Sequence, residues 1–422
     1  MTRLGRIGHW LALALTLLAA ALLLGGSAAI ALNRSDQVRR FTRAVEFDYV
    51  SWTSVSLLEK FESSALRPAT YLTEPERKNL VLEFVELVGE TARLRGELEA
   101  ILADPNLAEP QQVAQAVGVE WEETRGRLED LRPLAESVLQ ENVAAVLDDL
   151  GVGWGPALFP PVSFRFSGLP WALVVSPREV IRQDANIQLV PELSLEQQID
   201  LESQVEHGLE VSALVVGIGG LSTYPTMVME TTAVNWVVET VVHEWVHHYL
   251  ALRPLGFGYN RSAELRTFNE TVASLIGQEI GREVLARYYP EHLPLPPPPQ
   301  FPPVPQIGEP PVPVFDFQIE MRETREQVDA LLADGRVEEA EAYMEARRGV
   351  FWEHGFRHLR RINQAYFAFY GAYADVPGGA AGDDPVGEAV RRLWENVGDP
   401  VAFLRQVAWM SSTDDLFAAL PD

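Results

Sequence analysis

The sequence predicts an α+β protein that is mostly helical, and two observations carry this prediction. Residues 33–150 and 315–422 contain long runs with an apolar residue at every third or fourth position, a spacing typical of amphipathic helices. Between them, residues 151–289 hold short β-rich runs separated by glycine and proline, which indicate a small sheet. The composition suits a globular protein, because 47% of the residues are hydrophobic and 22% are charged.

The bulk composition excludes several kinds of function. A net charge of −26 argues against nucleic acid as a partner, because a polyanion binds basic surfaces. The chain has no cysteine, so disulfides, thiolate metal sites and cysteine nucleophiles are excluded. Any metal must be held by histidine and carboxylate side chains. The sequence leaves the oligomeric state open.

Residues 1–32 have the pattern of a signal anchor or a signal peptide. Two arginines precede an apolar run from Trp10 to Leu32, which is long enough to cross a bilayer as a helix. Ala29–Ala31 also resembles a signal-peptidase site, so cleavage stays open. We therefore expect a single-pass protein of the cell membrane with its large C-terminal part exported, or a secreted or periplasmic protein after cleavage. Arginines that follow the run oppose this orientation, but large domains translocate with little regard to nearby charge.

Residues 33–150 are predicted to form a helical bundle or a coiled-coil region. Thr73 and Glu76 match a capping box, and an apolar seam with a 4-3 spacing follows it. The seam consists of Leu80, Phe84, Leu87, Leu94, Leu98 and Ile101. Two further helices are expected over Val113–Leu131 and Leu134–Leu150, separated by a proline. Such a seam is typical of plain packing.

Residues 151–289 are predicted to form the core that carries the chemistry. We expect one small sheet with hairpin turns at Ser167–Gly168 and Gly219–Gly220, and a helix that Ser194 caps. The expected strands are Val162–Phe166, Trp171–Val175, Ile187–Val190, Val211–Ile218 and Met227–Met229.

Residues 290–314 are a proline-rich loop between this core and the C-terminal part. Twelve of the 29 prolines lie there, so the segment should run as extended polyproline, either as a spacer or as a ligand for an aromatic groove. Residues 315–422 are predicted to be helical, with helices at Phe315–Ala333 and Arg336–Ala374 and a helical tail at Pro385–Leu420.

The segment Val234–Leu250 has the pattern that indicates catalysis. It is apolar nearly all round and should be a buried helix, yet it carries three histidines and two glutamates. Burying these groups is costly unless they are paired or bound to a metal. His243 and His247 lie one turn apart on one helix face, so both imidazoles can reach one ion. Glu244 lies beside them, where a carboxylate can take a proton from water that the metal activates.

A catalytic zinc has three protein ligands, so a third ligand is expected on a separate element. Glu270 lies on a second expected helix, after a turn that Arg253–Pro254 and two glycines begin. Ala273, one turn beyond Glu270, would let two antiparallel helices approach closely. Glu264 lies on the same stretch and is the rival ligand.

The motif HEWVH followed by NETVA resembles the signature of the gluzincin metallopeptidases, in which a downstream glutamate often lies in an NExxA or NExxS helix. This resemblance implies a zincin-like catalytic core that acts on a peptide or protein substrate. It implies a Zn²⁺ ion held by His243, His247 and Glu270, with Glu244 as the general base.

A second, looser resemblance concerns the C-terminal part. Ile362–Ala365, with Tyr373 further on, is similar to a later helix of predicted bacterial membrane-associated aminopeptidases. This resemblance implies Tyr373 as a catalytic donor to the oxyanion of the tetrahedral intermediate. Tyr366, Tyr370 and His358 are the other candidates on the same stretch, and an aromatic core stripe is the structural alternative.

The sequence therefore predicts a zinc peptidase that is anchored in the membrane and belongs among the aminopeptidases if the second resemblance holds. An aminopeptidase needs an acid for the free amine of its substrate, and Glu230, Glu239 and Glu264 are equal candidates. Leu221–Val228 could be an edge strand that accepts an extended peptide, or a buried central strand. Two alternatives stay open: a catalytically degenerate membrane-anchored scaffold or adaptor with a structural metal site, and hydrolysis of a bond other than a peptide bond.

Overall fold

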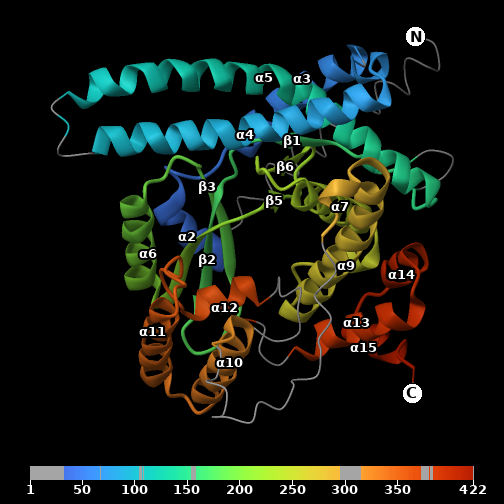
Figure 1. Ribbon diagram of the computed structural model, residues 1–422. Coiled ribbons are helices and arrows are strands. Elements are labelled where there is room, and N and C mark those ends of the chain that lie inside the picture. Colours follow the sequence, from blue (N-terminus) through green and yellow to red (C-terminus); the bar gives the residue numbers. More distant parts are fainter. Residues whose placement is uncertain are drawn as a thin grey trace, which may run out of the picture.

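The computed structural model describes residues 33–66, 68–103, 107, 109–153, 158–294, 315–371, 380 and 384–421. This part holds 14 α-helices and two three-stranded sheets (Figure 1), so the predicted mostly helical α+β class is confirmed. The predictions for residues 1–32, for residues 295–314 and for Tyr373 lie outside the described residues. Within the described ranges, no helix combines the length and the apolar character that a bilayer span requires.

Two long helices, α4 (Glu74–Ala103) and α5 (Pro110–Asp149), lie side by side along one face of the molecule (Figure 1). The expected apolar seam of α4 is buried at Phe84 and Leu87, which pack in one core with Leu128 of α5. Burial of this seam holds the two helices together.

Helix α5 is a single helix of 40 residues, so the expected break at Pro133 is wrong. A proline inside a helix removes one backbone hydrogen bond and costs about 3 kcal/mol. Apolar packing on both sides offsets this cost, because Leu128 before Pro133 and Ala135 and Val138 after it are at most 3% exposed. Packing of the whole helix therefore overrides the local signal.

The first sheet is antiparallel, with strand order β3-β2-β4. Its strands are β2 (Trp171–Pro177), β3 (Ala185–Leu189) and β4 (Val211–Gly217). One face is covered by α2 (Arg34–Thr42) and α6 (Leu195–Leu209), the other by α10 (Phe317–Ala333), α11 (Val337–Glu353) and α12 (Gln364–Tyr370). Successive residues of β2 enter these two cores in turn: Ala172 and Val174 pack towards α10–α12, and Leu173 and Val175 towards α2 and α6.

The second sheet has strand order β1-β6-β5, with β1 parallel and β5 antiparallel to β6. Its strands are β1 (Phe164–Phe166), β5 (Gly220–Leu221) and β6 (Thr226–Val228). The expected single sheet is therefore wrong, and neither Ser167–Gly168 nor Gly219–Gly220 closes a hairpin. Both turns carry the chain from one sheet to the other, because strand propensity identifies a strand without specifying its partner. Leu221–Val228 spans both an edge strand, β5, and a central strand, β6.

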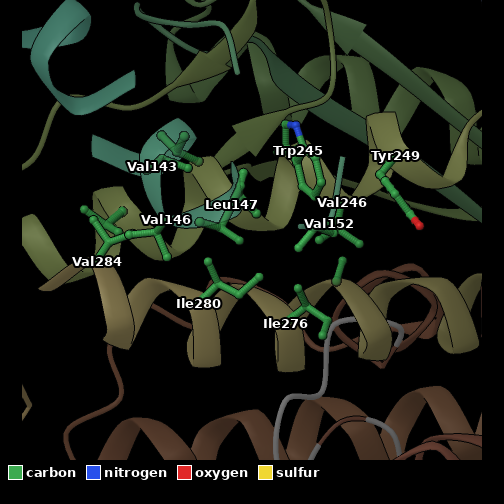
Figure 2. Close-up of a cluster of buried hydrophobic side chains, with 14 of the residues drawn as sticks. Val143, Val146, Leu147, Val152, Trp245, Val246, Tyr249, Ile276, Ile280 and Val284 are labelled. Carbon is green, nitrogen blue, oxygen red and sulfur yellow. The ribbon is translucent and has the colours of Figure 1, made fainter. Parts of the chain in front are cut away.

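Helices α7 (Val234–Leu250) and α9 (Ala263–Tyr288) form a second pair, joined through the short helix α8 (Pro254–Phe257). Figure 2 shows Val246 of α7 and Ile276 of α9 meeting in a cluster of buried apolar side chains, to which Val143 of α5 also belongs. This core is continuous across residue 150, where the sequence predicted a domain boundary.

The remaining helices pack around the two helix pairs and the two sheets. They are α3 (Tyr49–Leu66), α13 (Pro385–Val397), α14 (Pro400–Val407), α15 (Thr413–Ala418) and the 3₁₀ helices η1 (Pro68–Tyr71) and η2 (Pro290–His292). Helices α13–α15 pack against α9 (Figure 1). The expected helix Arg336–Ala374 is interrupted after α11, where Gly355 adopts a φ of +94° that ends a helix, and α12 follows as a separate short helix.

Candidate metal centre

Helices α7 and α9 bring three side chains of the predicted site together. His243 and His247 lie one turn apart on α7, and their Nε2 atoms are 3.1 Å apart. Glu270 of α9 places its Oε2 atom 3.3 Å from Nε2 of His243 and 3.5 Å from Nε2 of His247. Zinc bonds of about 2.0–2.1 Å in a tetrahedron place ligand atoms roughly 3.3–3.4 Å apart. The group His243, His247 and Glu270 could therefore hold a metal ion.

The donor atoms of this group also fit a cation chemically. Glu270 is 1% exposed, and its Oε2 atom has no hydrogen-bond partner among the described residues. The Asn269 side-chain oxygen accepts a hydrogen bond from Nδ1 of His247 at 2.8 Å, which leaves a lone pair on Nε2. Acceptor atoms that face one another this closely repel unless a positive charge lies among them.

The electrostatics of the group point the same way. Burial lowers the pKa of His247, but the Glu270 carboxylate outweighs burial and raises that pKa to about 9. Burial raises the pKa of Glu270, and the two imidazoles reverse this and hold the pKa well below its ordinary value. The three residues thus stabilise positive charge at their centre. A divalent ion carries more charge than the proton with which it competes.

Glu244 lies beside this group and not within it. The side chain is buried, and its Oε1 atom lies against β5, where a Cβ atom added to Gly220 would be only 2.6 Å away. A glycine at this position therefore leaves room for the carboxylate. Burial raises the pKa of Glu244, although His243 and His247 oppose the shift. A carboxyl group with a raised pKa is suited to accepting and returning a proton.

The metal group opens into a cleft of about 780 Å³. Residues of α7 and α9 line it, together with the β4–β5 connection and the end of α12. Of the oxyanion candidates, Tyr370 lines the cleft. Tyr366 is buried and does not line it, and its ring packs against that of Tyr370 with centroids 4.6 Å apart. His358 is exposed and does not line the cleft. Tyr373 lies outside the described residues.

The three acidic candidates for an amine anchor have different positions. Glu239 lines the cleft one turn before His243 on α7. Glu230 forms an ion pair with Arg132 at 2.7 Å and is not among the lining residues. Glu264 is exposed in the first turn of α9 and does not reach the metal group, so the structure does not bring the rival ligand to the site.

Several residues that build the site are missing from the sequence-based prediction. Ala273 is buried as expected, and α9 also comes close to α7 at Gly277 and Gly281. Tyr259 was also missed: its hydroxyl donates to Oε1 of Glu270, and its ring centroid lies 5.9 Å from that of His247. The spacing Ala273, Gly277, Gly281 repeats every four residues, a signal of close helix packing that could have been read from the sequence.

Comparison with known proteins gives no relative: no protein-family model, no curated protein and no solved structure matches this chain. The candidate site is therefore supported by its own residues and geometry. The zincin-like identity of residues 151–289 stays a prediction.

Proposed function

We propose that the protein is a zinc-dependent peptidase that hydrolyses peptide bonds, with Glu244 as its general base. One observation carries the proposal: two imidazole nitrogens and a buried carboxylate oxygen converge between α7 and α9, with a second buried carboxylate beside them. That oxygen lacks a hydrogen-bond partner among the described residues. An HExxH helix with this third ligand is the arrangement that metallopeptidases use.

The ligands and the base have separate tasks in this proposal. His243, His247 and Glu270 hold the ion, and Asn269 fixes the ring of His247. Bound zinc would act as a Lewis acid on the scissile carbonyl and lower the pKa of a water molecule. Glu244 takes one proton from that water as the water oxygen attacks the carbonyl carbon. It then passes this proton to the leaving amine when the C–N bond breaks. No external oxidant or reductant is needed.

Two further elements complete the proposal. Strand β5 is at the edge of its sheet and lines the cleft, so an extended peptide could bind along it through backbone hydrogen bonds. Tyr370 lines the cleft and can donate its hydroxyl to an oxyanion, as can Tyr373 in the prediction from sequence. Assignment to the aminopeptidases rests on the sequence resemblance, and Glu239 is the acid in the cleft that could hold an amine.

We also propose that residues 1–32 anchor the protein in the cell membrane, with the cleft on the exported side. The support is the apolar run that follows two arginines in the sequence. Protease accessibility in intact cells and in lysed cells would show on which side residues 33–422 lie.

The decisive experiment measures zinc and hydrolysis together on the full chain. Glu244→Gln should keep one zinc per chain and lower the rate of peptide hydrolysis about 10²- to 10⁴-fold. His247→Ala should lose the zinc as well. Glu283→Gln, an exposed position on α9, is the matched control and should keep both.

The other outcomes separate the alternatives. Full zinc occupancy in His247→Ala would overturn the ligand assignment. A zinc-loaded wild-type protein that cleaves no member of a peptide library would favour the scaffold. Cleavage of esters without cleavage of amides would favour another hydrolase activity.

A further inference from the structure

Arg266 of α9 is a cation in the metal cleft that the proposed mechanism does not use. Among the described residues that line the cleft, Arg266 is the only arginine or lysine. It lies four residues before Glu270, so both side chains project from the same face of α9, about one turn apart. The Tyr259 ring, which approaches His247, is 5.8 Å from the Arg266 guanidinium carbon.

Arg266 is a buried residue without an anionic partner among the described residues. The residue is 9% exposed, its Nε atom has no hydrogen-bond partner, and no carboxylate among the described residues forms an ion pair with it. Two other cations with little exposure do have a polar partner: Lys60 is 2.5 Å from Glu136, and Arg253 donates to the backbone oxygen of Tyr249. Because an uncompensated buried charge is costly, a cation left in this state indicates a ligand that brings the missing charge.

The two ends of the cleft carry side chains of opposite charge, Glu239 and Arg266. Glu239 lies towards the N-terminal end of α7 and packs against Gly281 of α9, whereas Arg266 lies near the other end of the cleft, beside Tyr259. The metal group is between them, since His243 follows Glu239 on α7 and Glu270 follows Arg266 on α9. An anionic group would be repelled at the Glu239 end and attracted at the Arg266 end.

We propose that Arg266 binds a carboxylate of the substrate, so that the cleft takes peptides with a carboxylate close to the cleaved bond on the Tyr259 side of the metal group. The planar guanidinium fork matches a carboxylate through two parallel hydrogen bonds. This carboxylate is either the C-terminus of a peptide or the side chain of an aspartate or glutamate. The inference rests on the proposed peptidase function for its substrate class, but the carboxylate site itself can be tested by binding alone.

The test uses the full chain carrying Glu244→Gln and loaded with zinc, so that ligands bind without being cleaved. Calorimetry compares three probes: N-acetyl-Ala-Ala with a free carboxylate, the same dipeptide as its amide, and N-acetyl-Ala-Asp-amide. At least one carboxylate probe should bind about 30-fold or more tightly than the neutral amide, because a buried charge pair contributes this much. Arg266→Met should bring the ratio close to one, and Arg266→Lys should retain part of it.

The matched control is Arg282→Met on the same helix, where the arginine is exposed and pairs with Glu279 at 2.6 Å. This variant should keep the full preference. Melting of Arg266→Met shows whether the variant is folded, and its melting temperature should equal or exceed that of the parent, because the charge that it removes has no carboxylate partner among the described residues. A lower melting temperature would identify a structural partner for Arg266 and count against the proposal.

Each pattern of binding has one meaning. Tight binding of the free acid alone identifies the C-terminal carboxylate, and tight binding of the Asp-amide identifies the side chain. Equal affinity for all three probes, or a preference that survives Arg266→Met, overturns the carboxylate site. An Arg266-dependent preference in a protein whose wild-type form cleaves no peptide leaves this site standing and removes the peptidase. Peptide cleavage by the wild-type protein without an Arg266-dependent preference removes the carboxylate site and leaves the proposed peptidase function standing.

Discussion

The helix pairs α4/α5 and α7/α9 are both buried against one shared core, yet only in the second pair do glycines face the partner helix. A Cβ atom added to Gly96 of α4 or to Gly126 of α5 would meet nothing within 4 Å. On α9, a Cβ atom at Gly277 would lie 3.1 Å from the backbone oxygen of Glu239, and one at Gly281 would lie 2.9 Å from the Glu239 Cγ atom. Glycine contact between helices thus belongs to the pair that carries the candidate metal group.

The two pairs also differ in how they treat a buried acid. Glu136 of α5 accepts hydrogen bonds from Lys60 at 2.5 Å and from the backbone N–H of Phe166 at 2.8 Å. Glu270 of α9 has two imidazoles and a tyrosine hydroxyl around it, and one of its oxygens lacks a partner among the described residues. A buried carboxylate needs compensating charge. The chain supplies that charge to Glu136, whereas the charge for Glu270 would come from the proposed metal ion.

The largest effect that tests this difference is expected from Glu270→Gln. The amide keeps the shape of the side chain but removes the charge, so zinc should be lost and peptide hydrolysis should fall by at least about 10³-fold. Zinc per chain and the rate of hydrolysis are the two measurements. Glu264→Gln is the matched control on the same helix, and because Glu264 is exposed, it should retain both.

If Glu264→Gln loses zinc and Glu270→Gln keeps it, the rival ligand is the true one, and the contrast between the two buried acids loses its meaning.

The core of the site could be predicted from the sequence because its signals are local. His243, Glu244 and His247 are fixed relative to one another by helix geometry alone, whatever the rest of the chain does. Glu270 is a longer-range prediction, and it depended on a short connection and a second helix. Tyr259 and Gly220 reach the cleft only through the folding of separate elements, so no spacing in the sequence reveals them. Arg266 could have been found, because it lies one helical turn before Glu270 on the same face of α9.

The same distinction applies to the fold. Helix and strand types follow from periodicity, and β1, β2, β4 and β6 lie close to their expected positions. The predicted strand pairing was wrong because each sheet contains strands that are far apart in the chain: Phe164 pairs with Thr226, and Trp171 with Gly217. Continuity of α5 through Pro133 was missed for a similar reason, since the packing that stabilises it comes from α4 and from the second sheet.

A smaller effect, on stability alone, is expected from Lys60→Met. Removing the partner of buried Glu136 should lower the free energy of unfolding by about 3–5 kcal/mol at neutral pH, measured by urea unfolding. Zinc content should not change. Arg95→Met is the control, since its pair with Glu99 on α4 is exposed at 2.9 Å and such pairs contribute about 0–1 kcal/mol.

The stability lost in Lys60→Met should depend on pH, and the direction of this dependence follows from the pKa of Glu136. Burial raises the pKa of Glu136, although Lys60 opposes the shift, so the folded state holds a proton on this carboxyl more tightly than the unfolded state does. Without Lys60 that effect grows. The lost stability should therefore return as the pH falls from neutral through the raised pKa towards the ordinary value of 4.5. A loss of stability that is equal at all pH values would show that Lys60 contributes by packing and not by charge.

The smallest effects are expected from the glycines, and they test the first difference between the two pairs. Gly277→Ala must displace Glu239 or His243 by a few tenths of an ångström, since the new Cβ would lie 3.2 Å from the Cβ of His243. We expect zinc affinity, measured against a competing chelator, to fall about tenfold, the lower end of the range for changes around metal ligands. Gly96→Ala in α4 has open space and should stabilise the protein by about 0.5–1 kcal/mol without changing zinc affinity. Equal zinc affinity in both variants would mean that α7 and α9 can separate without losing the ion, and the close approach of their backbones would then serve packing alone.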